Sequence, residues 1–112
     1  MMANNNKGGF IYLMTNKNRT VLYTGVTSNL KQRIWQHENH LFPSSFTDKY
    51  NAEYLIYYEW FDQIQSAINR EKQIKRWTRA KKNFIIDLKN KEWRFLNEEV
   101  YNDIYSLLAE DT

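Results

Sequence analysis

The stretch that decides the fold is "GGFIYLMTNKNRTVLYTGV", residues 8–26. Both of its ends are rich in β-branched and aromatic residues, and the first alternates in side-chain direction, which predicts two strands. The polar segment "TNKNR" between them favours a turn, so a hairpin is the simplest connection. If the loop is centred between Lys17 and Asn18, antiparallel register places Tyr12 opposite Tyr23, with both phenols on one face of the sheet. A slip of one residue would place them on opposite faces.

The second strand leads into a predicted helix, "LKQRIWQHENH", which Ser28 or Asn29 can cap and which ends before Pro43. Arg33 and His37 lie one turn apart on this helix, so both side chains can reach the same point. The stripe that should face the sheet contains Leu30, Ile34 and His37.

The rest of the chain predicts one more strand and three more helices. The loop "LFPSSFTDKY" precedes "AEYLIYYEW", an almost unbroken apolar and aromatic run that fits a strand buried on both faces, the third and central one. Helices are expected from Asp62, a possible cap, to about Thr78, then over 80–89, and in the C-terminal segment "EEVYNDIYSLLAE". The predicted class is α+β: a small three-stranded, mainly antiparallel sheet, made of the hairpin plus a central strand and flanked by helices.

Length and composition exclude several classes of protein. With 112 residues, 42% of them hydrophobic, three glycines and one proline, the chain fits one globular domain and is not of low complexity. The absence of cysteine excludes disulfides, thiolate metal sites and cysteine nucleophiles. No apolar run approaches the roughly 18 residues of a membrane span, so a soluble, cytoplasmic protein without membrane contact is expected.

The positive charge is concentrated in one part of the chain. A net charge of +3 is weak evidence for a polyanionic partner. Between Arg70 and Lys82, however, there are seven basic residues and one acid, Glu71, with Trp77 among them. Such a run is usually a solvated helix surface, and contact with a nucleic-acid backbone is the alternative.

Glu71 falls within the apolar stripe of its predicted helix, between Ala67 and Ile74. Burying a charged carboxylate costs free energy unless a cation, a metal ion or hydrogen bonds compensate. One interpretation is an ion pair with Lys75, one turn later in the favourable order. The other is a ligand of a hard divalent cation, with water at the remaining positions.

The other candidates also have ordinary interpretations. Arg33 and His37 fit a solvated helix face, and Tyr12 and Tyr23 fit the face of a sheet. Functionally, an arginine fork can hold a phosphate, and a histidine one turn away can hold an oxygen or move a proton.

Together these motifs resemble the GIY-YIG nuclease superfamily. The resemblance rests on "FIY" at 10–12, "YTG" at 23–25, the helix with Arg33 and His37, and "REKQIKRW" at 70–77. It is greatest to small bacterial single-domain members related to the nuclease domain of the excinuclease C subunit, and it extends from about residue 10 to 95. The implied organisation is a flexible N-terminus over 1–9, a nuclease domain over 10–96, and a C-terminal helix over 97–112 packing on that domain.

The resemblance implies roles for individual residues. Tyr12 and Tyr23 match tyrosines that line the active site, Arg33 an arginine that contacts the scissile phosphate, His37 a position held by histidine or tyrosine, and Glu71 the single metal-binding glutamate. Phe10 and Thr24 depart from the tripeptides, and Asn83 and Asn90 compete for the place of a family asparagine. The residues expected to contact nucleic acid are Gly25, Lys31, Lys75, Arg76, Arg79, Lys81 and Lys82.

The function predicted in this way is that of a metal-dependent endonuclease that hydrolyses phosphodiester bonds in nucleic acid, DNA rather than RNA, in repair or recombination. Glu71 would hold one Mg²⁺ or Mn²⁺, and Arg33 would meet the charge on the phosphoryl oxygens. Tyr12 would orient or deprotonate water, and acting as a base would require a depressed pKa. Tyr23 and His37 would complete the proton network. The alternatives are a non-catalytic nucleic-acid-binding domain of the same fold, and a module that binds an acidic protein. Protein partners and oligomeric state are left open, and a monomer is compatible.

Overall fold

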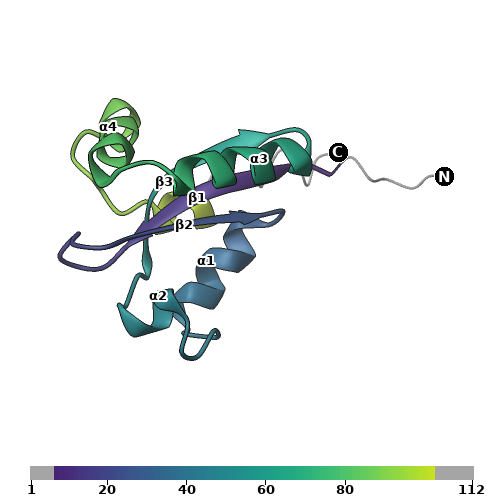
Figure 1. Cartoon of the computed structure of the whole chain (residues 1–112). Coiled ribbons are helices and arrows are strands. Elements are labelled where there is room, and N and C mark those ends of the chain that lie inside the picture. The colour runs from purple at the N-terminus through teal and green to yellow at the C-terminus, as the bar shows by residue number, and fades with distance from the viewer. Residues whose placement is uncertain (1–6, 103–112) are drawn as a thin grey trace.

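The computed structural model describes residues 7–102, which build a three-stranded antiparallel sheet with helices on both faces (Figure 1). The strands are β1 (Gly9–Thr15), β2 (Leu22–Thr27) and β3 (Tyr54–Phe61), in the order β2-β1-β3. The predicted α+β class is therefore confirmed. The prediction that the third strand is central is wrong, because β1 lies between the other two and is buried along its whole length.

The hairpin forms as predicted, but its register differs by two residues. Tyr12 pairs with Gly25, and Met14 pairs with Tyr23. The loop is longer than expected because Asn16 closes it, accepting hydrogen bonds through Oδ1 from the backbone N–H groups of residues 20 and 21. A shift of two residues preserves the alternation of side chains, so both phenols still lie on one face of the sheet.

Two groups of helices cover the two faces (Figure 1). One face of the sheet packs against α1 (Leu30–Glu38) and α5 (Asn97–Tyr101), with the short α2 (Phe46–Lys49) beside them. The other face packs against α3 (Ile64–Lys75) and α4 (Arg79–Lys89). Alternation along β1 explains the division: its even-numbered side chains enter the first core, and its odd-numbered ones enter the second.

The helix ends agree with the sequence in part. Asn29 caps α1 by accepting a hydrogen bond from the N–H of Gln32, as one of the two predicted caps. The prediction that Asp62 caps α3 is wrong, because Gln63 occupies the cap position and makes no side-chain capping bond. The helix α2 lies in a segment expected to be a loop. Of the predicted C-terminal helix, residues 103–110 lie outside the described part of the chain, as do residues 1–6 of the expected N-terminal segment.

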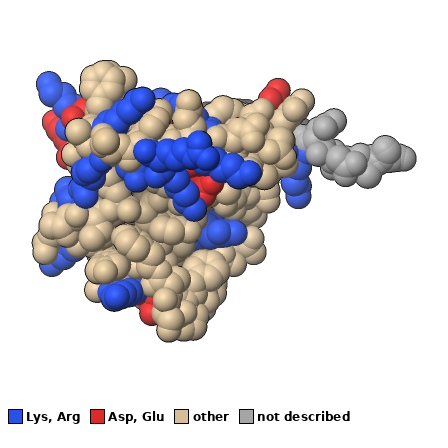
Figure 2. Space-filling view, viewed as in Figure 1, with Lys and Arg blue, Asp and Glu red and all other residues tan. Residues whose placement is uncertain are grey.

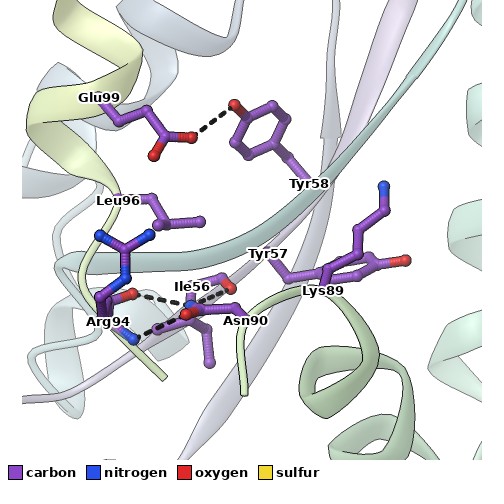
Figure 3. Close-up of a pocket in the computed structure, with 8 residues that line it drawn as sticks. All are labelled: Ile56, Tyr57, Tyr58, Lys89, Asn90, Arg94, Leu96 and Glu99. Atoms are coloured by element: carbon purple, nitrogen blue, oxygen red, sulfur yellow. Dashed lines mark hydrogen bonds between the residues drawn. The ribbon is translucent and has the colours of Figure 1, made fainter. Parts of the chain in front are cut away.

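The segment after α4 is fixed to the outer edge of β3 (Figure 3). Asn90 donates from Nδ2 to the carbonyl oxygens of Ile56 and Arg94, at 2.9 Å each, and its Oδ1 accepts from the Arg94 N–H. Asn97 continues the attachment, because its Oδ1 accepts from the Leu55 N–H at 2.8 Å. These bonds satisfy backbone groups at the edge of β3, while its apolar side chains are buried in the cores on the two faces. In the described part of the chain, no helix is long and apolar enough to cross a membrane.

Candidate active site

The centre of the candidate site is Tyr12, in the middle of β1. Its side chain is fully buried, and its hydroxyl lies 3.0 Å from Nε2 of His37 on α1. The other ring nitrogen of His37, Nδ1, lies 3.2 Å from the hydroxyl of Thr47 on α2. A central strand and two helices therefore hold one chain of hydrogen-bonding groups.

Gly25 makes room for this tyrosine. A Cβ at Gly25 would lie 2.5 Å from the Tyr12 hydroxyl oxygen and closer still to the ring. Because Gly25 is buried beside Tyr12 on β2, its part in the site is to let the phenol lie across the neighbouring strand.

We expect Gly25→Ala to lower the free energy of unfolding by about 1–3 kcal/mol, because the added methyl group overpacks a close contact. Urea unfolding of both proteins measures the change. In a Tyr12→Ala background the same substitution should cost much less, since the ring it collides with is gone. An equal cost in both backgrounds would show that Tyr12 is not what requires the glycine.

Three aromatic rings meet around the Tyr12 hydroxyl. The ring centroids of Tyr12 and Tyr23 are 6.2 Å apart, and each lies 5.7 Å from the centroid of His37. Phe46 of α2 stacks on the outer side of Tyr23, with centroids 6.0 Å apart. The predicted grouping of the two phenols with the histidine is thus present in the fold.

An open pocket of about 200 Å³ lies against this cluster. Arg33 reaches it from α1, with its guanidinium 5.6 Å from the centre of the Phe42 ring. The short helix α2 forms part of the pocket wall and was not predicted, although Ser45 three residues before Asp48 is a helix-capping pattern. The residues that line the pocket are Tyr23, Arg33, His37, Phe42, Ser45 and Thr47.

Glu71 approaches the cluster from α3, on the other face of the sheet. Its side chain is almost fully buried, and its negative charge contributes to the raised pKa of Tyr12. Lys75 of the same helix makes an ion pair with it, with Nζ 2.7 Å from Oε2. The ion pair anticipated from the spacing is therefore present.

Burial dominates the electrostatics of Tyr12. Removal from water raises the pKa of the phenol, Tyr23 raises it further, and the charge and hydrogen bond of Arg33 lower it by less. The depressed pKa that a tyrosine base would need is thus not found: the pKa is shifted the other way. Tyr12 is a neutral hydroxyl at physiological pH.

His37 is shifted toward its neutral form. Burial, and then the nearby charge of Arg33, lower its pKa to about 4. A neutral imidazole that carries its proton on Nδ1 can donate to Thr47 and accept from the Tyr12 hydroxyl through Nε2. That tautomer satisfies both contacts at once.

His37 should make the protein less stable in mild acid. The unfolded chain binds a proton near pH 6.5 and the folded chain only near pH 4, so stability falls as the pH drops between these values. We expect wild-type protein to lose about 1–2 kcal/mol more than His37→Gln between pH 7 and pH 5, measured by urea unfolding.

His40 provides a control of opposite sign. It contacts Asp48 and Glu53 at 3.0 Å each, and hydrogen bonds to these carboxylates raise its pKa. Its contribution is present below pH 6.5 and is lost as the pH rises through the raised value. His40→Gln should therefore steepen the loss of stability in acid, whereas His37→Gln should flatten it. The same slope in both variants would contradict the assigned shifts.

Basic side chains gather over α3 and α4, in the upper half of the face shown in Figure 2. The basic residues between 70 and 82 make different contacts in the structure. Arg70 pairs with Glu59, Lys81 lies over the ring of Trp77, and Arg79 donates to carbonyls of the hairpin loop. Exposed side chains of the predicted nucleic-acid-binding set are Lys31, Lys75, Arg76, Arg79 and Lys81, with Lys82 half-buried.

The two candidate asparagines have different surroundings. Asn90 lies at the β3 edge with its amide engaged by backbone groups, and it lines a different pocket from the one at the candidate site (Figure 3). Asn83 is half-buried on α4, and its Oδ1 accepts a hydrogen bond from Arg79 at 3.0 Å. The first is therefore a structural residue, and the second orients a basic side chain.

The residues available for a metal are few. Within residues 7–102 no group of three or more histidine and acidic side chains could hold an ion. A cation at this site would therefore rest on Glu71 and water, which is compatible with the way magnesium is usually held. The buried carboxylate requires a compensating positive charge, which a bound cation could supply and which Lys75 supplies in this structure.

Comparison with known proteins identifies the class that this fold and site define. Residues 8–83 match the GIY-YIG catalytic domain, and the chain belongs to that family. A UPF0213 protein of Clostridium perfringens is 35% identical over 81 residues, which cover 72% of this chain and 85% of that protein. A UPF0213 protein of Syntrophus aciditrophicus is 30% identical over 73 residues, 65% of this chain and 83% of that protein.

A solved structure supports the fold. The solution NMR structure of a UPF0213 protein from Bacillus halodurans superposes with a TM-score of 0.50 at 23% identity, covering 77% of this chain and 89% of that one. The family is one of nucleases, which implies a nucleic-acid substrate and, in general, dependence on a divalent metal.

Proposed function

We propose that the protein is a metal-dependent endonuclease that hydrolyses phosphodiester bonds in nucleic acid, with DNA the expected substrate in repair or recombination. One observation supports this above the others. Tyr23, Arg33 and His37 line one pocket, and the buried hydroxyl of Tyr12 lies 3.0 Å from Nε2 of that histidine. The charge of Glu71 acts on Tyr12 from a further element, α3.

Arg33 is the group suited to bind the phosphate. It lines the pocket, with its guanidinium 5.6 Å from the centre of the Phe42 ring, within cation–π range. A planar guanidinium can donate two hydrogen bonds to phosphoryl oxygens and meet the charge that grows on them during hydrolysis.

The two phenols take different parts. Tyr12 is fully buried and neutral, so it serves as a fixed link between β1 and His37 and does not contact water in the pocket. Tyr23 lines the open pocket and is the phenol that an attacking water can reach. We therefore assign the orientation of water to Tyr23, and Tyr12 and His37 hold the surrounding hydrogen bonds.

Glu71 is the residue that would hold a divalent cation, Mg²⁺ or Mn²⁺. When bound, such a cation supplies positive charge to neutralise the leaving oxygen. The contribution of the chain is a carboxylate held almost without exposure at the edge of the cluster. The exposed basic residues of α3 and α4 would contact the nucleic-acid backbone, which gives weak sequence preference and steep salt dependence.

The test is a cleavage screen with the purified chain. Labelled duplex, single-stranded and branched DNA, and matched RNA, are incubated with Mg²⁺, with Mn²⁺ and with chelator. We expect cleavage of at least one substrate with metal, and none with chelator. Absence of cleavage on every substrate with either metal would overturn the proposal.

A non-catalytic nucleic-acid-binding domain is the second candidate, and one observation favours it. Lys75 already compensates the charge of Glu71, so this carboxylate does not require a metal ion to balance its charge. Salt-dependent binding of the substrates, without cleavage in Mg²⁺ or Mn²⁺, would establish this alternative.

A further inference from the structure

The ion pair between Glu71 and Lys75 is a feature of the site that the proposed hydrolysis does not use. Nζ of Lys75 lies 2.7 Å from Oε2 of Glu71. The two partners differ in exposure, because the side chain of Glu71 is 11% exposed and that of Lys75 is 53% exposed. The carboxylate is therefore enclosed by neighbouring atoms, whereas the ammonium has solvent beside it into which it can move.

Both members of the ion pair interact electrostatically with a tyrosine of the site. Tyr23 interacts electrostatically with Lys75, and Glu71 interacts with Tyr12. The positive charge of Lys75 therefore acts on one phenol, and the negative charge of Glu71 acts on the other. A divalent cation bound by Glu71 would have to compete with the Lys75 ammonium, which lies 2.7 Å from the same carboxylate.

We propose that Lys75 is a placeholder for the metal: it compensates the charge of Glu71 in the metal-free protein, and it competes with a divalent cation for the same carboxylate. This inference rests on the proposed function, because it takes Glu71 as the metal ligand. Lys75 acts through Glu71 and is therefore a positioning residue, not a catalytic one.

The position of Lys75 on its helix suits this part. It is the last residue of α3, where the partial negative charge of the helix end favours a cation. A four-carbon stem lets the ammonium withdraw to solvent or to a backbone phosphate without movement of the helix. The competing account is an ordinary surface pair at one-turn spacing, which stabilises the helix slightly and has no connection with metal binding.

Titration of the metal-free chain with Mn²⁺, without nucleic acid, separates these accounts. We expect Lys75→Met to bind Mn²⁺ about three- to tenfold more tightly than wild type, because the displaced ion pair no longer opposes binding. Lys75→Arg, which can still pair with Glu71, should return toward the wild-type affinity. Lys72→Met is the matched control, because it removes the same charge from the same helix. Lys72 directly follows Glu71 in the sequence, and adjacent residues on a helix do not face each other.

Thermal unfolding gives a second readout. Without metal, Lys75→Met should have a lower Tm than wild type, because its buried carboxylate has lost the compensating cation. Saturating Mn²⁺ should raise the Tm of Lys75→Met more than that of wild type.

The outcomes distinguish this inference from the proposed function. Equal Mn²⁺ affinity in wild type and Lys75→Met would overturn the placeholder role and leave the nuclease proposal standing. Equal tightening in Lys75→Met and Lys72→Met would show a general effect of charge and would also overturn it. Absence of Mn²⁺ binding to any variant would overturn both. Competition as expected, without cleavage of any substrate, would overturn the nuclease proposal alone.

Discussion

Arg33→Ala should lower the rate of phosphodiester cleavage at saturating substrate by about 10²- to 10³-fold, the typical cost of losing one preorganised donor to a developing negative charge. Arg33 is the one cation among the six residues that line the pocket, so no neighbour there can replace it. Single-turnover cleavage, with substrate binding measured separately, gives the rate without a contribution from affinity.

Two variants control for charge and for packing. Arg33→Lys keeps the charge but loses the fork, and should fall between wild type and Arg33→Ala. Lys31→Ala removes a charge from the exposed side of the same helix, and should weaken binding while changing the saturated rate little. If Arg33→Ala and Lys31→Ala reduce the saturated rate equally, Arg33 has no special place at the phosphate.

Glu71→Gln should reduce cleavage in Mg²⁺ or Mn²⁺ by at least about 10³-fold, because charge stabilisation by a bound metal is worth several kcal/mol. The amide has nearly the same size as the carboxylate, so the buried position remains filled. The partner Lys75 is left in an exposed position, which limits the cost to folding. Cleavage rate and Mn²⁺ affinity are measured on the same preparations.

Glu59→Gln is the matched control for the loss of a buried carboxylate. Glu59 lies on β3. Its carboxylate makes an ion pair at 3.0 Å with Arg70, which is on the same helix as Glu71. We expect this variant to be less stable but to keep its metal dependence. Retention of metal-dependent cleavage in Glu71→Gln would remove Glu71 from the site and with it the proposed mechanism.

The alternation of side chains explains why the sequence located the phenols. Tyr12 and Tyr23 share a face because even shifts in register preserve the side of each residue. The register itself could not be obtained, because it depends on how Asn16 closes the loop. Similarly, the apolar run of β3 indicated that its side chains are buried, but not that β3 is an edge strand. Its free edge is bonded by Asn90 and Asn97 in place of a fourth strand.

The i,i+4 spacing of Arg33 and His37 predicted that they lie on one side of their helix. The position of a charged residue within an apolar stripe singled out Glu71. What the sequence could not supply is the environment of each group. Burial of Tyr12 outweighs the charge of Arg33, which reverses the shift in pKa that a base would need and moves the water-orienting role to Tyr23. The pocket wall formed by α2 was missed because a helix of four residues leaves little periodicity to detect.

The most direct measurement of the central claim is anomalous X-ray diffraction from crystals of the wild-type chain grown with Mn²⁺. We predict one Mn²⁺ bonded to the carboxylate of Glu71, on the side that faces Tyr23 and Arg33, with the ammonium of Lys75 moved away. Mn²⁺ bound elsewhere, with the ion pair of Glu71 and Lys75 intact, would contradict the claim that these residues form one metal-dependent site.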